Sequence, residues 1–207
     1  MKLPDPALLI ITDRLQARRP LEEIAEAAFA AGCRWLSLRE KDLPPPERQD
    51  MLRRLVEIGR KYHASVTVHE DVAAAAAAAG AAGIHLPRDG DVVAARRMLG
   101  AGALIGVSAH DIDEIARAEE AGADYVTLSP IFPSAGKPGY PALGIDELAD
   151  CAAKTVLPVI ALGGIGTERI PACLAAGAAG VAAMGAVMSA GDTSHATTAL
   201  ILGLRSA

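Results

Sequence analysis

Residues 120–132 read EAGADYVTLSPIF. A charged, helix-like stretch ends here at Gly122, and an apolar run from Tyr125 to Leu128 follows directly. Glycine adopts the left-handed conformation that ends many helices at little cost. The segment therefore predicts a helix that stops near Gly122 and a strand that starts at once, which is the junction of an alternating fold.

The same Ala-Gly junction recurs at 31–32, 79–80 and 176–177. Apolar runs predict eight strands, at 7–12, 35–39, 65–69, 83–86, 104–108, 125–128, 159–162 and 180–184. Between them, amphipathic stretches predict helices that include 21–31, 47–62, 111–121 and 169–176, with a short alanine helix at 73–79. Alternating strands and helices indicate a parallel sheet, and eight such units predict a single (β/α)8 TIM barrel over residues 1–207.

Composition narrows the class of protein. The hydrophobic content is 51% and the aromatic content only 3%, so we expect an aliphatic core. A net charge of -5 argues against a nucleic-acid partner. We find neither a signal peptide nor the ~20 apolar residues that a membrane span requires. The three cysteines lack CxxC spacing and are interpreted as buried thiols, so we expect a cytoplasmic protein.

In such barrels the active site lies at the carboxyl ends of the strands. Three cations fall there: Arg39 and Lys41 after the second strand, and Lys137 in the long loop after the sixth. Together they could clamp a phosphate or pyrophosphate. The alternative is that each pairs with a surface carboxylate such as Glu40 or Asp42.

Acidic residues follow the third and fourth predicted strands. Glu70, Asp71, Asp89 and Asp91 could hold Mg²⁺, which commonly takes one or two carboxylates together with phosphate oxygens. The alternative is that Asp71 and Asp91 cap the helices that begin beside them.

Glycines mark the last two strand ends. Gly163 and Gly164 follow the seventh strand and Gly185 follows the eighth, where barrels often bind phosphate through backbone N–H groups. Simple turn geometry is the alternative. His63 and His110 are weak signals, and we expect His63 to face solvent.

Beyond these patterns, the chain resembles the thiamine phosphate synthase/TenI family over nearly its whole length. The matching segments are LLIITDR from 8, LREKD from 38, AAGIHLP from 81, IGVSAHD from 105, AGADYVTLSPIFPSAGKPG from 121, LPVIALGGI from 157 and AGVAAMGAV from 179. The resemblance implies a (β/α)8 barrel that joins hydroxymethylpyrimidine pyrophosphate to thiazole phosphate and releases pyrophosphate. It also implies Mg²⁺ as cofactor and a possible homo-oligomer.

The resemblance also implies roles for individual residues. Two cations would hold pyrophosphate, a serine would contact the pyrimidine or the leaving group, and His69 would be one of the substrate-binding residues. Three residues at the last two strand ends would offer N–H groups to the thiazole phosphate. The two cations are Arg39 and Lys41, and the serine is Ser108. The three residues that face the thiazole phosphate are Gly164, Met184 and Gly185. Ser134 and Lys137 would lie over the substrates.

Some positions depart from the synthase pattern. An Asn-Asp pair is replaced by His69-Glu70, a metal-binding Asp aligns with Gly90, and a Gln aligns with Ser37. These changes resemble the TenI branch, whose thiazole tautomerases need no metal, yet their histidine is Pro130 here. The synthase reaction is the preferred hypothesis because the cations are present. The alternatives are a tautomerase with His69 or His85 as proton carrier, and a thiazole-phosphate binding protein without catalysis.

Overall fold

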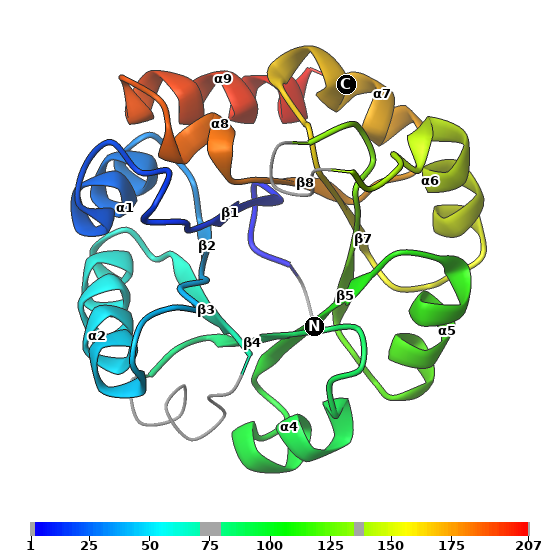
Figure 1. The fold of residues 1–207 in the computed structure, drawn as a ribbon, viewed down its shortest axis with the longest axis horizontal. Coiled ribbons are helices and arrows are strands. Elements are labelled where there is room, and N and C mark those ends of the chain that lie inside the picture. Colours follow the sequence, from blue (N-terminus) through cyan, green and yellow to red (C-terminus); the bar gives the residue numbers. More distant parts are fainter. Residues whose placement is uncertain (1–2, 71–79, 135–138, 207) are drawn as a thin grey trace.

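The computed structural model describes residues 3–70, 80–134 and 139–206. Within them, parallel strands close into a barrel in the order β1 to β8, as the sequence predicts (Figure 1). The strands are β1 (Leu8–Ile11), β2 (Trp35–Leu38), β3 (Ser65–His69), β4 (Gly83–Leu86), β5 (Leu104–Ala109), β6 (Tyr125–Leu128), β7 (Val159–Leu162) and β8 (Gly180–Ala183).

Helices form a ring around this barrel (Figure 1). They are α1 (Leu21–Ala30), α2 (Pro45–Lys61), α4 (Val92–Leu99), α5 (Ile112–Glu120), α6 (Gly144–Ala153), the 3₁₀ turn η1 (Thr167–Arg169), α7 (Ile170–Ala175), α8 (Gly185–Met188) and α9 (Thr193–Arg205). The four helices that the sequence predicts at 21–31, 47–62, 111–121 and 169–176 are confirmed to within two residues at either end. The helix predicted at 73–79 lies outside the described residues.

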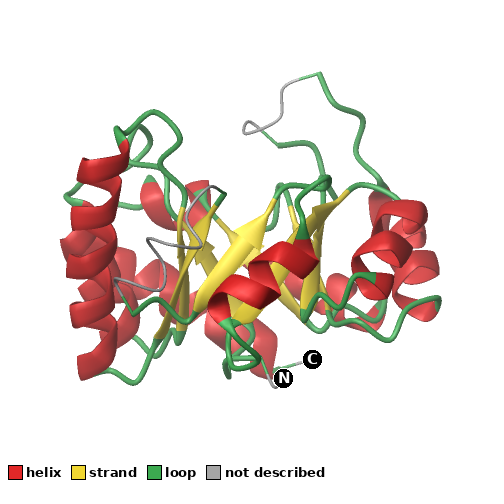
Figure 2. Ribbon diagram, turned by 90° about the horizontal axis from the view of Figure 1, so that it is seen from below, coloured by secondary structure: helices red, strands yellow, loops and turns green. Residues whose placement is uncertain are grey.

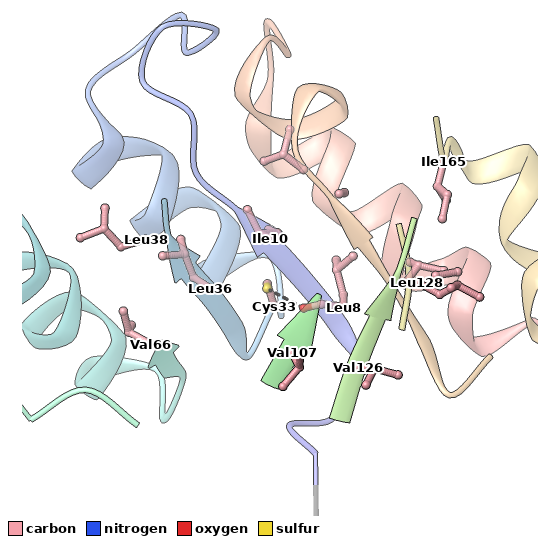
Figure 3. Packing of buried hydrophobic residues seen from close by; sticks show 14 of the residues in the cluster. Leu8, Ile10, Cys33, Leu36, Leu38, Val66, Val107, Val126, Leu128 and Ile165 are labelled. Carbon is pink, nitrogen blue, oxygen red and sulfur yellow. Dashed lines mark hydrogen bonds between the residues drawn. The ribbon is translucent and has the colours of Figure 1, made fainter. Parts of the chain in front are cut away.

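Both faces of the sheet are buried, which explains why the strands are near-continuous apolar runs. Residues such as Leu8, Ile10 and Leu36 point outward and pack under the helices (Figure 3). Their alternate neighbours point inward and form a second cluster, whose buried members are Leu9, Ile11, Trp35, Leu104, Tyr125, Ile160 and Ala182. The aliphatic core that the composition predicts is thus divided between the two faces of the barrel wall.

All three cysteines are buried free thiols, as expected. Burial raises the pKa of Cys33 to about 12 and the pKa values of Cys151 and Cys173 to about 11. In the described part of the chain, no helix combines the length and the apolar character needed to cross a bilayer. His63 is exposed, as predicted.

Figure 2 shows where the loops gather. The loop that follows β6 rises above the end of the barrel toward which the strand arrows point, while both chain ends lie at the opposite end. The base of this loop is closed by backbone bonds, because Leu143 N–H donates to Pro130 O at 2.8 Å and Gly144 N–H donates to Ile131 O at 3.0 Å. The fold therefore directs the polar strand ends and this loop to one face.

Candidate active site

A cavity of ≈560 Å³ opens at the carboxyl ends of the strands. It is lined by residues from every strand end, and most of the site residues that the sequence predicts are among them: Arg39, Lys41, His69, Glu70, Asp89, Ser108, Ser134, Gly164, Met184 and Gly185. Lys137 and Asp71 lie outside the described residues. Of the predicted site residues that the structure describes, only Asp91 is absent from the cavity wall.

Arg39 and Lys41 both line this cavity, but they differ in their ion-pair partners. Lys41 Nζ lies 2.5 Å from Glu70 Oε1, so the ends of β2 and β3 are joined by an ion pair. The Arg39 N–H donates to Thr12 Oγ1 at 2.9 Å, which fixes its backbone. Among the residues that the structure describes, none forms an ion pair with the Arg39 guanidinium. Arg39 is therefore available to an anionic ligand.

The carboxylates suggested as surface partners for these cations are engaged elsewhere. Glu40 is buried, and both of its carboxylate oxygens accept from the Arg14 backbone N–H, at 3.1 and 3.2 Å. Burial raises the pKa of Glu40. Asp42 pairs with the Arg14 guanidinium. Glu40 and Asp42 are therefore not the partners of Arg39 and Lys41, although Lys41 does pair with another carboxylate, that of Glu70, as the alternative allows.

The acidic candidates separate into two groups. Asp91 caps α4, because its carboxylate accepts from the Ala94 N–H at 2.8 Å, as the capping alternative predicts. Glu70 and Asp89 line the cavity. Residues 3–70, 80–134 and 139–206 contain no group of three acidic, histidine or cysteine side chains that could hold a metal ion. Two carboxylates still fit Mg²⁺ when phosphate oxygens complete its coordination.

His85 lies in the barrel interior and lines the cavity. Its Nδ1 is 3.0 Å from the Tyr125 hydroxyl and its Nε2 is 3.0 Å from Ser108 Oγ. The His69 ring stacks nearby, with 4.5 Å between ring centroids. Burial lowers the pKa of His85 to about 3, and burial together with the His85 ring lowers that of His69 well below its ordinary value. Both imidazoles are neutral at physiological pH.

Glycine is required at the turn after β7. Gly163 and Gly164 have φ angles of 103° and 63°, in the left-handed region. A Cβ on Gly164 would also overlap the Pro133 carbonyl oxygen. Phe132 N–H donates to Gly163 O at 3.1 Å, so the loop after β6 lies against this turn. The short helix α8 begins beside it at Gly185, and N–H groups of a first helical turn lack partners within the helix.

Three residues of the cavity wall were not predicted from the sequence as site residues. Gln16 comes from the loop after β1, and its Nε2 lies 3.6 Å from Met184 Sδ. His110 lies on β5's carboxyl side, and its Nδ1 is 2.7 Å from Ser129 O. Its position two residues after Ser108, on the same side of an extended chain, was the available signal. Arg88 pairs with buried Glu114 at 3.4 Å, which reduces its repulsion toward a cation.

The family model described as "Thiamine monophosphate synthase" matches residues 8–187. The chain belongs to the thiamine monophosphate synthase family. This agrees with the resemblance drawn from the sequence motifs, and the closed barrel agrees with the fold that it implied.

Individual relatives match the chain over almost its full length. A thiamine-phosphate synthase from Salinispora tropica is 37% identical, over 94% of this chain and 95% of the relative. A protein from Geobacter sulfurreducens, provisionally named for the same activity, is 42% identical over 95% and 93%. The solved thiamine phosphate pyrophosphorylase from Pyrococcus furiosus superposes with a TM-score of 0.87 at 28% identity, covering 96% of this chain and 95% of that one.

Proposed function

We propose that the protein is a thiamine phosphate synthase that joins hydroxymethylpyrimidine pyrophosphate to thiazole phosphate and releases pyrophosphate. The observation that carries this proposal is that one cavity contains two separate features suited to anions. Arg39 and Lys41 supply positive charge at the end of β2, while the Gly163–Gly164 turn and the start of α8 supply backbone N–H groups. A transferase for two phosphorylated substrates needs two such features.

Bond breaking between the pyrimidine carbon and pyrophosphate requires positioned charge more than an acid or a base. Arg39 would accept the pyrophosphate directly, because it has no ion-pair partner in the described part of the chain. Lys41 would exchange Glu70 for the same ligand. Ser108 and His69 would contact the pyrimidine side, and Gly164, Met184 and Gly185 would hold the thiazole phosphate. Ser134 and Lys137 would lie over both substrates.

Mg²⁺ fits this proposal as a partner of the leaving group. Glu70 and Asp89 would hold it from the cavity wall, and the ion would neutralise charge on the pyrophosphate oxygens. Asp91 is withdrawn from this set because its carboxylate caps α4. The three free cysteine thiols accord with a reducing compartment, so we place the reaction in the cytoplasm.

The tautomerase alternative gains nothing from the two histidines suggested for it. A general acid or base works best when its pKa lies near the operating pH. The pKa values of His69 and His85 are both lowered by burial, away from neutrality. His85 is in addition fully occupied by Tyr125 and Ser108.

The direct test is turnover by purified protein given both substrates and Mg²⁺, with pyrophosphate release and thiamine phosphate measured separately. Arg39→Gln should lower kcat/KM by about 10- to 100-fold, the effect of removing a hydrogen bond to a charged group. Arg53→Gln, an exposed arginine on α2, is the matched control and should leave kcat/KM unchanged.

No product at high enzyme concentration would overturn the synthase proposal. If calorimetry then showed thiazole phosphate binding without turnover, the protein would instead be a binding protein. Proton exchange on a thiazole carboxylate phosphate would identify a tautomerase.

A further inference from the structure

A row of hydroxyl and imidazole groups crosses the barrel interior below the cavity. The Tyr125 hydroxyl lies 3.0 Å from His85 Nδ1, and the other ring nitrogen, Nε2, lies 3.0 Å from Ser108 Oγ and 3.3 Å from Thr127 Oγ1. Tyr125 and Thr127 are each at most 1% exposed and lie off the cavity wall, whereas His85, also 1% exposed, and Ser108 both line the cavity. The row thus runs from the barrel core to the cavity wall.

Packing fixes the far end of this row. The Tyr125 ring meets Trp35 edge-on, with 4.7 Å between centroids and an interplanar angle of 77°. Gly106 is its neighbour in β5, and a Cβ at that position would overlap the Tyr125 ring. Glycine at 106 therefore provides the space in which the phenol reaches across the barrel to His85.

Proton counting selects one arrangement. Burial raises the pKa of Tyr125 and lowers that of His85 to about 3, so the phenol keeps its proton and the imidazole carries a single N–H. If Nδ1 carried that proton, it would donate to the phenol oxygen. The phenol proton would then have no acceptor, because the described residues give the Tyr125 hydroxyl no partner but His85.

Leaving the buried phenol donor unsatisfied disfavours that tautomer. In the other tautomer the phenol donates to Nδ1, and Nε2–H donates to Ser108 Oγ. The serine oxygen is then an acceptor toward His85, and its own proton remains for a group in the cavity. Thr127 Oγ1 can then only accept from Nε2–H, at 3.3 Å, so its own proton has no acceptor among the described residues. The phenol bond is shorter, at 3.0 Å, and a phenol is a stronger donor than an aliphatic hydroxyl, so the tautomer that keeps the phenol bond is favoured.

We propose that His85 is a positioning residue, held in the Nε2–H tautomer by Tyr125, that makes Ser108 a hydrogen-bond donor toward the bound ligand. Ser108 therefore selects ligand atoms that carry a lone pair and no proton, such as an unprotonated ring nitrogen or a phosphate oxygen. The proposal rests on the proposed function only for the identity of that ligand.

The tautomer is measured in the ligand-free protein, without any assay of turnover. In ¹⁵N-labelled protein near neutral pH, the His85 ring should show a protonated Nε2 and an unprotonated Nδ1, with the signals assigned by their loss in His85→Gln. In Tyr125→Phe, Nδ1 loses its donor and the proton should distribute over both nitrogens. A protonated Nδ1 in the wild-type protein would overturn the proposal.

The effect on ligand is measured by a double-mutant cycle. Ser108→Ala should lower kcat/KM by about tenfold, the loss of one hydrogen bond, and Tyr125→Phe should lower it by about threefold or more. Because Tyr125 acts through Ser108, adding Tyr125→Phe to Ser108→Ala should cost nothing further. Fully additive losses would contradict the proposal. Tyr62→Phe, outside the barrel against Phe29, is the matched control and should leave kcat/KM unchanged.

Titrations of the Ser108→Ala protein with inorganic pyrophosphate and with hydroxymethylpyrimidine separate the two kinds of acceptor. Affinity should fall for the probe that Ser108 contacts and stay unchanged for the other, and unchanged affinity for both would contradict a donor role. If the wild-type protein has no synthase activity, the proposed function fails, while the NMR result still decides the tautomer.

Discussion

At the scale of single residues, the strength of the Lys41–Glu70 ion pair matters most for ligand entry. The two side chains are 54% and 35% exposed, and pairs this exposed contribute only about 0–1 kcal/mol to stability. A pyrophosphate ligand with several negative charges can therefore separate them at small cost. The pair holds both side chains at the cavity edge and leaves each free to change partner.

Replacing Glu70 tests whether its carboxylate holds Mg²⁺. Glu70→Gln keeps the shape of the side chain and removes its charge, so the Mg²⁺ concentration for half-maximal activity should rise about tenfold or more. The thermal midpoint should change little, because the lost ion pair is exposed. Activity across a Mg²⁺ series and a thermal unfolding curve measure the two effects, with Glu57→Gln on α2 as control. An unchanged Mg²⁺ requirement would remove Glu70 from the metal site.

At the scale of elements, α4 shows how one carboxylate serves structure instead of chemistry. Asp91 precedes the helix with an extended backbone, and its side chain accepts from the Ala94 N–H. Gly100 follows the helix with a φ of 82°, a conformation that suits glycine. The short helix is thus bounded by a cap at each end, close to the cavity-lining residues Arg88 and Asp89.

Asp91→Ala should lower the free energy of unfolding by about 1 kcal/mol, a usual value for a lost helix cap. The Mg²⁺ requirement should stay as in the wild-type protein, because the carboxylate is engaged with α4. Urea unfolding and a Mg²⁺ titration measure the two effects. Asp91→Ser, which can still cap, should recover most of the stability. A raised Mg²⁺ requirement in both variants would return Asp91 to the metal site.

The elements themselves were predictable from sequence because each strand is a short, mostly apolar run and glycine marks the junctions. Strand β3 was predicted at its observed bounds, Ser65–His69. Helix α2 begins two residues before the prediction, at Pro45, since proline fits the first turn of a helix, where its missing N–H is not needed. Local chemistry therefore determines nearly all of this fold.

At the scale of the whole molecule, the barrel interior has a polar half and an apolar half. Inward-facing positions on β3 to β6 carry Thr67, His69, His85, Ser108 and Thr127, whereas β7, β8 and β1 contribute aliphatic residues such as Ile160, Ala182 and Leu9. This arrangement needs all eight strands in register, so no single segment reveals it.

For the same reason the candidate site was predicted only in part. Strand ends located Arg39, Lys41 and Ser108 correctly at the cavity wall. The bond from Tyr125 to His85 was not foreseen, because Tyr125 reads as the apolar start of a strand and its partner lies 40 residues away. The contacts of Arg14 with Glu40 and Asp42 depend on the path of the loop after β1, and no sequence motif predicts that path.

Two histidines whose pKa values are lowered in the folded protein, His85 and His69, make the stability of the whole barrel depend on pH. His85 has an ordinary pKa of 6.5 when unfolded and about 3 when folded, so the unfolded chain binds a proton that the folded chain refuses between these values. The free energy of unfolding should therefore fall as pH is lowered from 6.5 toward 3, by roughly 1 kcal/mol per pH unit from this residue. The lowered pKa of His69 acts in the same direction.

Urea unfolding at pH 7, 6, 5 and 4 measures this slope. His85→Gln should flatten it, because the variant has no proton to gain at that position. His63→Asn is the control and should not alter the slope, because solvent reaches that side chain in the folded protein. Equal slopes for wild type and His85→Gln would contradict a neutral, buried His85.

The three buried cysteines also make local unfolding of the barrel measurable. Cys33 lies at the junction of α1 and β2, where its thiol contacts Leu8 O and Trp35 O, while Cys151 and Cys173 belong to α6 and α7. A thiol reagent needs the exposed thiolate, which burial withholds from each of them. The rate at which each cysteine is alkylated therefore reports how often the helix or strand around it unfolds locally. No probe has to be introduced into the protein for this measurement.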